Sequence, residues 1–123
     1  MNDFIKKNVT LVIPTYNAQK TIDKTLNNVS KKFQNIIIID GHSQDLTKKI
    51  CKGYNTQFFT SKKNRGIQLK LGGEKANTNW IFFLHADSIL QNDAIDEMAQ
   101  FISIDKNHYR AAAFKLKFNQ KNI

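Results

Sequence analysis

Three short polar stretches follow apolar runs of the chain and carry the residues best suited to chemistry. His85 and Asp87 come directly after "IFFL", Asp40 closes "NIIIID", and residues 14–17 ("PTYN") follow "VTLVI". A carboxylate at the end of a strand can hold Mg²⁺ or Mn²⁺, hard cations that take oxygen ligands and bridge to phosphates. It can also accept hydrogen bonds from a ribose hydroxyl or a base N–H. Each stretch taken alone is also compatible with a capping or turn role.

Further residues could serve a phosphorylated ligand. The loop "KKNRG" (62–66) places two lysines and Arg65 ahead of a helix-like segment, where a guanidinium could bind a diphosphate. The same loop could be a solvated basic surface. The imidazole of His85 could donate a hydrogen bond to a ribose or a phosphate, whereas carboxylate and water suit Mn²⁺ better than imidazole does. Tyr16 could stack on a nucleobase or simply pack as a core or surface aromatic.

The elements that must position these residues alternate between strand-like and helix-like periods. Asn17 and Ser43 are expected to cap the first two helices. Strands are predicted over residues 9–13, 35–40, 56–60, 79–84 and 111–118, and helices over 17–33, 43–53, 67–76 and 92–102.

The order βαβαβαβαβ, with short connections, predicts an α/β, Rossmann-like single domain over residues 1–123. Its sheet should be mainly parallel, with helices on both faces. Ligands of such sheets bind beyond the carboxyl ends of the strands, which gathers residues 14–17, 40–45 and 85–87 at one edge. No G-x-G-x-x-G motif follows the first strand. A NAD-type site and a nucleotidyltransferase with a glycine-rich phosphate loop are therefore disfavoured.

The charge balance indicates which partners to expect. Lys and Arg number 19 against 10 Asp and Glu, a net charge of +9, which suits nucleotides, phosphates or an acidic membrane face. Lysines that merely solvate the surface would give the same excess. Nucleic acid is not an expected partner, because Arg65 and Arg110 are the only arginines and no nucleic-acid-binding motif occurs.

A cytoplasmic protein is expected, with at most a peripheral contact at the inner face of the membrane. Cys51 is the only cysteine and cannot form an internal disulfide, which fits a reducing compartment. The N-terminus lacks the apolar segment of a signal peptide. No apolar run approaches the roughly 18 residues of a membrane span.

Taken together and in order, three motifs resemble the family-2 glycosyltransferases, which have the GT-A fold. They are "VTLVIPTYNAQKTI", "IIIIDGHSQDLT" and "NWIFFLHADSIL". The segment "RGIQLKLGGEKA" ahead of "FLHAD" is similar to a bacterial subgroup in which an R-x-x-Q-x-x-x-G helix precedes H-A-D in place of D-x-D. The resemblance runs from about Val9 to Phe118. His42, inserted in the D-G-S pattern, departs from the family and bears on substrate rather than on fold.

The resemblance implies transfer of a sugar, with inversion, from a UDP- or GDP-linked nucleoside diphosphate sugar to an unknown acceptor. Asp40 would contact the base, Asp87 would hold Mn²⁺ or Mg²⁺, and His85 would contact the sugar or a phosphate. The implied nucleotide-binding residues are Pro14, Thr15, Tyr16, Asn17, Asp40, Arg65, Gln68 and His85.

The resemblance also implies a longer protein, in which the catalytic base follows the donor-binding part. No carboxylate lies between Asp105 and the end of the sequence, so the base is expected beyond Ile123 and the sheet is expected to be incomplete. Alternatives are a non-catalytic nucleotide-binding module or an inactive, truncated remnant. An uncovered sheet edge could pair with a second copy or with a partner chain.

Overall fold

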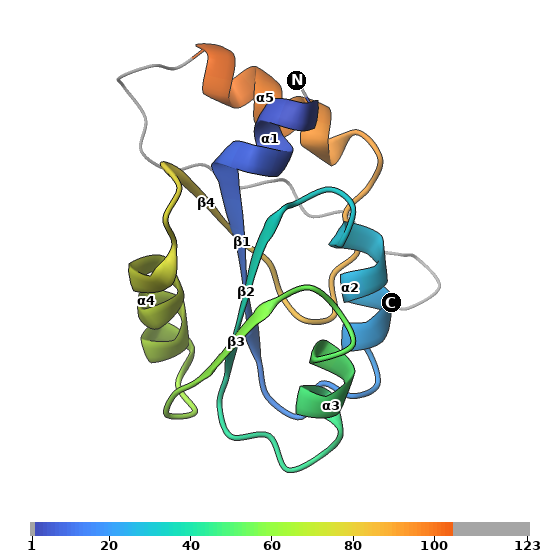
Figure 1. The fold of residues 1–123 in the computed structure, drawn as a ribbon, viewed down its shortest axis with the longest axis vertical. Helices are drawn as coiled ribbons and strands as arrows, with labels where there is room; N and C mark the ends of the chain where they lie inside the picture. The colour runs from blue at the N-terminus through green and yellow to red at the C-terminus, as the bar shows by residue number, and fades with distance from the viewer. Residues whose placement is uncertain (1, 105–123) are drawn as a thin grey trace, which may run out of the picture.

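A computed structural model describes residues 2–104 of the chain (Figure 1), which form an α/β fold. The predicted strand over residues 111–118 lies outside the described residues. The elements, in order, are α1 (Asn2–Asn8), β1 (Val9–Thr15), α2 (Ile22–Val29), β2 (Asn35–Asp40), α3 (Thr47–Cys51), β3 (Gln57–Thr60), α4 (Arg65–Lys75), β4 (Trp80–Phe83) and α5 (Ala94–Ile104).

The sheet is parallel throughout its four described strands, in the order β3-β2-β1-β4. The isoleucine run of β2 occupies an interior position, as expected for a strand covered on both faces. Ile36 and Ile38 belong to the larger core cluster, whereas Ile37 and Ile39 belong to a smaller one with Val12. Successive side chains of a strand point to opposite faces, so the two clusters mark the two faces of the sheet.

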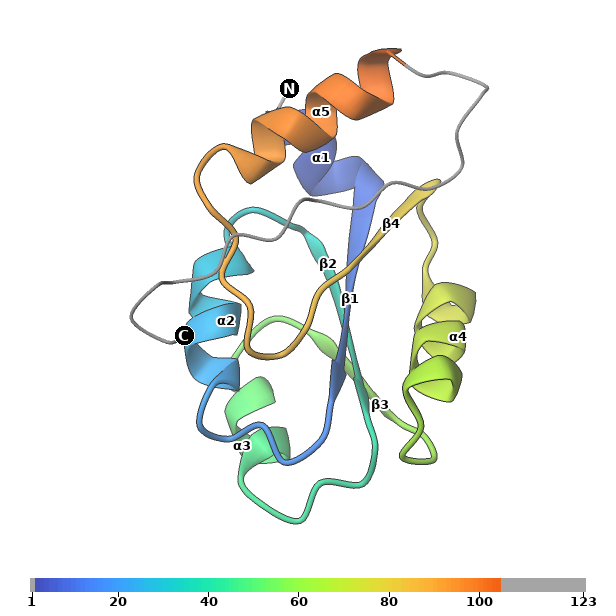
Figure 2. The same cartoon turned by 180° about the vertical axis from the view of Figure 1, so that it is seen from behind.

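Helices cover both faces, which confirms the predicted layers. In Figures 1 and 2, α2 and α3 lie on one side of the sheet and α4 on the other. On the first side, Ile22, Leu26 and Val29 of α2 are fully buried, as their helical spacing predicts. On the second side, α4 comes close to β1, because Gly72 has no side chain where it faces Val12.

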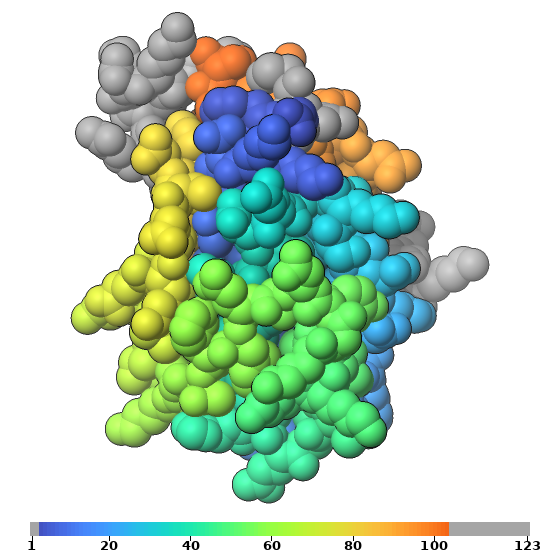
Figure 3. Space-filling view, viewed as in Figure 1, coloured from blue at the N-terminus to red at the C-terminus, as the bar shows by residue number. Residues whose placement is uncertain are grey.

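A helix that the sequence did not reveal precedes the first strand. α1 packs against α5 at the end of the molecule opposite the carboxyl ends of the strands, and the space-filling view shows it seated above β2 (Figure 3). So short a helix is marginal in isolation. Burial of Ile5 against the core therefore stabilises it. Within residues 2–104, no helix is long and apolar enough to cross a membrane.

The predicted starts of two helices were wrong. α2 begins at Ile22 rather than near Asn17, and α3 begins at Thr47 rather than near Ser43. The acceptor at the start of α3 is Asp45, whose Oδ1 accepts a hydrogen bond from the backbone N–H of Thr47 at 2.9 Å. Asn17 and Ser43 instead make contacts between loops, which local sequence does not reveal.

Candidate functional site

The predicted polar stretches lie at the carboxyl ends of the strands. Thr15 of β1 pairs with Asp40 of β2, which pairs with Thr60 of β3. The connections after these strands lie at the bottom of Figure 1. β4 ends earlier, with Phe83 opposite Val12, so the loop that follows it begins deeper along the sheet.

Asp40 is buried and holds the first two loops together. It is 2% exposed. Its Oδ1 accepts hydrogen bonds from the hydroxyls of Thr15 and Ser43, each at 2.6 Å, and its Oδ2 accepts from the backbone N–H of Ser43 at 2.7 Å. Such charge-assisted bonds are stronger than neutral ones. Asp40 therefore fixes the end of β1 relative to the loop after β2.

Asn17 joins the same two loops from the other side. Its backbone N–H donates to Oγ of Ser43 at 2.7 Å, and its Oδ1 accepts from the backbone N–H of Gln44 at 2.9 Å. Asn17 and His42 have positive φ, 47° and 62°, a region that asparagine tolerates better than most residues. Ser43, which the sequence suggested as a helix cap, is thus the link between Asp40 and Asn17.

Asp45 fastens the far end of this loop. Partial burial tends to raise its pKa, but hydrogen bonds from the hydroxyl and N–H of Thr47 and from the N–H of Gln19 outweigh it. The pKa of Asp45 is therefore below that of an ordinary aspartate, because the charged carboxylate is the form that accepts these hydrogen bonds. The ionised side chain ties the loop ahead of α2 to the start of α3.

Gln68 is buried beneath the site, where it binds the backbone rather than facing solvent. It is 4% exposed, and its Nε2 donates to the carbonyls of Thr15 at 3.0 Å and Ile39 at 2.9 Å. These carbonyls are at the ends of the two central strands. Gln68 therefore holds α4 against the sheet edge, and a contact with diphosphate or ribose stays a prediction for it.

Pro14 and Thr15 are buried at the end of β1, whereas Tyr16 is 40% exposed. The Nζ of Lys63 lies 3.9 Å from the centroid of the Tyr16 ring, a cation–π contact. The backbone of Lys63 also lies so close to Gly41 that a Cβ there would come within 3.0 Å of its Cα. The basic loop of residues 62–66 thus covers part of the site, and Lys63 lies next to two of the predicted stretches, at Tyr16 and at Gly41.

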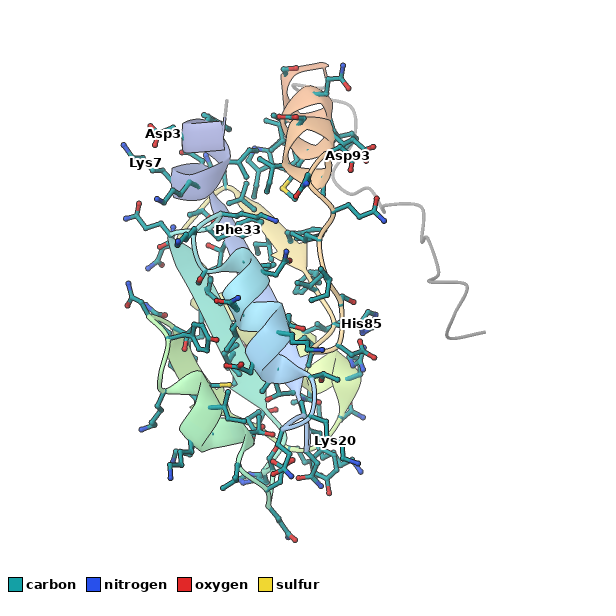
Figure 4. All side chains as sticks on the ribbon, turned by 90° about the vertical axis from the view of Figure 1, so that its right-hand side faces the viewer. Asp3, Lys7, Lys20, Phe33, His85 and Asp93 are labelled. Carbon is teal, nitrogen blue, oxygen red and sulfur yellow. The ribbon has the colours of Figure 1, made fainter. Side chains whose placement is uncertain are left out.

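Arg65 and His85 are brought together from segments 20 residues apart. Nη1 of Arg65, the first residue of α4, lies 2.8 Å from Nδ1 of His85, and both side chains are exposed. Figure 4 shows His85 on the connection between β4 and α5, away from Asp3 and Lys7 of α1. Arg65 and His85, which come from two separate motifs of the sequence, therefore form one hydrogen-bonded pair in the structure.

The loop that carries Asp87 is fastened to α2. The buried hydroxyl of Thr25 contacts the carbonyls of Ala86 at 2.8 Å and Ser88 at 3.0 Å. Asn28 exchanges two hydrogen bonds with the backbone of Leu90. Sequence reasoning missed Thr25 and Asn28, because nothing in a helical pattern shows which polar residue meets a loop some 60 residues later.

Asp87 itself is exposed and makes no hydrogen bond or ion pair with another residue in the range 2–104. Over the same range, no three His, Cys, Asp or Glu side chains are grouped as metal ligands. A single carboxylate suits a cation that takes its other oxygens from phosphates and water. The residues present thus fit Mn²⁺ or Mg²⁺ held jointly by Asp87 and a diphosphate, and do not form an all-protein metal cage.

The candidate residues lie on an open edge of the molecule. Two hollows in the described part of the chain are elsewhere, one beside 91–93 and the other lined by Lys6, Lys31, Lys32, Asn92 and neighbours. Neither includes a candidate residue. The exposed side chains of Tyr16, Arg65, His85 and Asp87 are therefore accessible to a ligand that spans the sheet edge.

Comparison with protein families gives an extended match. The family model described as "Glycosyl transferase family 2" matches residues 10–120, which include every candidate residue. An uncharacterized glycosyltransferase of Rickettsia felis is 29% identical over 121 residues, which cover 92% of this chain and 20% of that protein. The poly(ribitol-phosphate) β-N-acetylglucosaminyltransferase TarP of Staphylococcus aureus is 30% identical over 107 residues, covering 77% and 33%. The chain thus spans about a fifth to a third of the length of these relatives.

Solved structures share the fold. Residues 1–349 of Staphylococcus aureus TarS match with a TM-score of 0.70 at 20% identity, over 79% of this chain and 32% of that one. Glucosyl-3-phosphoglycerate synthase of Mycobacterium tuberculosis, in complex with Mn²⁺, UDP and phosphoglyceric acid, matches with a TM-score of 0.59 at 17% identity. That match covers 70% of this chain and 35% of the synthase chain. The predicted Rossmann-like, GT-A type fold is confirmed.

Proposed function

Because the chain belongs to glycosyltransferase family 2, we propose that its sheet edge binds a nucleoside diphosphate sugar and that the protein transfers the sugar to an acceptor. The observation that carries the proposal is the carboxylate of Asp87, which has no partner among residues 2–104 and lies two residues beyond the His85 that contacts Arg65. A free carboxylate next to cationic and hydrogen-bonding groups suits a metal-bound diphosphate. The acceptor and an inverting stereochemistry are part of the same proposal.

The nucleoside would occupy the side of the site formed by residues 14–17 and Asp40. A carboxylate has about four acceptor positions, and Asp40 uses three of them for Thr15 and Ser43. One position is left for a base N–H. Tyr16 would stack on the base, in place of or together with Lys63 on its face. Uracil is the favoured base, since the structurally similar mycobacterial synthase was solved with UDP.

The diphosphate would lie towards Arg65 and Asp87. The guanidinium has five N–H donors, and the contact with His85 uses Nη1 alone, so Arg65 keeps donors for phosphate oxygens. When bound, Mn²⁺ or Mg²⁺ would supply positive charge that stabilises the departing diphosphate. The role of this chain is then to orient the donor and to stabilise developing negative charge.

Calorimetric titration tests the proposal directly. UDP and GDP would be added to the 123-residue chain with and without Mn²⁺, and UDP is expected to bind more tightly when the metal is present. Asp87→Asn should abolish the metal-dependent part of the affinity. Asp96→Asn, which removes an exposed carboxylate of α5, is the matched control and should leave it intact. Failure of both nucleotides to bind under every condition would contradict the donor site.

A further inference from the structure

The contact between Arg65 and His85 determines which ring nitrogen of His85 carries the proton. Nη1 of Arg65 lies 2.8 Å from Nδ1 of His85. Arginine offers only donors and stays protonated in proteins. Nδ1 must therefore accept the hydrogen bond through its lone pair. The proton of the imidazole is then on Nε2, which makes that nitrogen a donor.

We propose that Arg65 is a positioning residue that holds the His85 ring in one orientation and in its Nε2–H form, so that Nε2–H donates to an oxygen of the bound sugar nucleotide. The inference rests on the proposed function. The proposed role limits the ligand atom: an N–H group can donate a hydrogen bond to a hydroxyl or a phosphate oxygen but cannot coordinate a cation.

The geometry divides the work between His85 and Asp87. With the Nδ1 lone pair facing a guanidinium and a proton on Nε2, neither ring nitrogen of His85 is free to ligate a metal. Asp87 has no partner among the described residues that would occupy its oxygens. The H-A-D sequence thus places an oxygen-binding donor and a cation-binding carboxylate two residues apart on one loop.

The fold gives Arg65 a defined position from which to act. It is the first residue of α4, whose start is capped by Asn64: Oδ1 of Asn64 accepts a hydrogen bond from the backbone N–H of Ile67 at 3.0 Å. One turn later, Gln68 binds the ends of β1 and β2. The guanidinium therefore extends from a fastened helix start towards the loop after β4. A hydrogen bond between two exposed side chains contributes little to stability, so its main effect is on ring orientation.

Nuclear magnetic resonance of the ring nitrogens tests the first step in the protein without ligand. In the full 123-residue chain labelled with ¹⁵N-histidine, Nδ1 of His85 should have the shift of a lone-pair nitrogen and Nε2 that of a protonated one. Arg65→Met should move both shifts towards those of the exposed His42, and Arg65→Lys, which restores a charged donor, should move them part of the way back.

A proton on Nδ1 in the wild-type protein would overturn the inference, as would His85 shifts that Arg65→Met leaves unchanged. The backbone amide signals of β2 show whether each variant keeps the fold. If Arg65→Met disturbs those signals, the wild-type spectrum still decides, because the position of the proton is read there without any substitution.

Two substitutions at His85 test the second step by separating the ring nitrogens. Asparagine places its carboxamide near the position of Nδ1, so His85→Asn keeps an acceptor for Arg65 and loses the outward donor. Glutamine places its carboxamide near the position of Nε2, so His85→Gln keeps that donor. With Mn²⁺ present, His85→Asn should bind UDP several-fold to about tenfold more weakly than His85→Gln, as expected for one net hydrogen bond.

The outcomes distinguish this inference from the proposed function. Equal affinities of the two variants, or tighter binding by His85→Asn, would overturn the role of Nε2 while leaving the donor site in place. A wild-type protein that binds neither UDP nor GDP would overturn the proposed function and with it the role of Nε2 in binding. The resonance experiment would then still decide whether Arg65 orients His85.

Discussion

Replacing Gly72 by alanine should destabilise the protein, although alanine is the better helix former. A Cβ at Gly72 would lie 2.3 Å from Cγ1 of Val12 and 3.3 Å from Cβ and Cγ2 of that residue. Carbon atoms in contact are normally about 3.5–4.0 Å apart. α4 and β1 would have to separate by about 1 Å or more, because Val12 is fully buried and cannot turn away.

The expected size follows from two opposing terms. Overpacking of a well-packed core costs about 1–3 kcal/mol. Alanine in place of glycine inside a helix returns about 0.5–1 kcal/mol. Gly72→Ala should therefore lower the free energy of unfolding by about 1 kcal/mol, the middle of a range of about 0–2.5 kcal/mol that the difference between these two terms allows.

Gly73→Ala is the matched control, on the same helix and one residue away. The nearest atom to a Cβ at Gly73 is Cδ1 of Ile81 at 3.9 Å, which is an ordinary contact. The second variant should therefore show only the propensity gain and be more stable than the wild type by about 0.5–1 kcal/mol.

Urea unfolding of the wild type and both variants, followed by circular dichroism, measures the two changes. α4 carries both Arg65 and Gln68, so Gly72→Ala should also weaken UDP binding, whereas Gly73→Ala should not. The reasoning is refuted if Gly72→Ala is as stable as Gly73→Ala. Such a result would mean that α4 does not approach β1 as closely as the structure shows.

Three further outcomes are expected. Thr25→Val keeps the shape of the side chain but removes the hydroxyl bound to the carbonyls of Ala86 and Ser88. It should lower the free energy of unfolding in urea by about 1–3 kcal/mol and weaken the Mn²⁺-dependent binding of UDP. Unchanged UDP binding would argue against a role for this hydrogen bond in holding the Asp87 loop. Burial, with a smaller effect of the Asp40 charge, raises the pKa of Cys51 to about 12. The thiol of the folded protein should therefore resist a thiolate-directed reagent at neutral pH and react once urea unfolds the chain. Rapid reaction of the folded protein would contradict the burial of Cys51. The hydrogen bond to Asp23, more than burial, raises the pKa of Tyr54. This bond should therefore stabilise the fold below the ordinary tyrosine pKa and lose its effect as the pH rises through the higher pKa of the folded protein. Asp23→Asn should lower the pKa of Tyr54 in a titration followed by ring resonances, and an unchanged pKa would contradict the assigned cause.

The sequence predicted the strands well, because their signal is local. Runs of β-branched and aromatic residues located all four described strands, and the run "NIIIID" matched β2 residue for residue. The first strand was predicted too short, because β1 continues through Pro14 to Thr15. Helix starts were predicted less well. Asn17 and Ser43 are good cap residues by type, yet they bind each other across two loops. Which partner a short polar side chain takes depends on what the fold brings near it.

The candidate site shows the same division. The order of the motifs, together with the rule that ligands bind at the carboxyl ends of strands, is enough to predict that residues 14–17, Asp40 and residues 85–87 lie at one edge. The individual roles were less accessible. Gln68 is buried against two strand ends, and Thr25 fastens the Asp87 loop from a distant helix, because backbone groups freed at strand ends must find partners wherever the fold supplies them.

The sequence by itself determined the parallel α/β fold, the family and the edge at which chemistry is expected, because periodicity and motif order are properties of the chain. Only the tertiary structure decided which candidate side chains are exposed at the sheet edge and which are buried beneath it. It placed Asp40 and Gln68 inside, left Asp87 unpaired among the described residues and set Arg65 against His85. Hydrogen bonds of this kind depend on positions fixed to a fraction of an ångström between segments 20 or more residues apart, and residue spacing alone carries no such information.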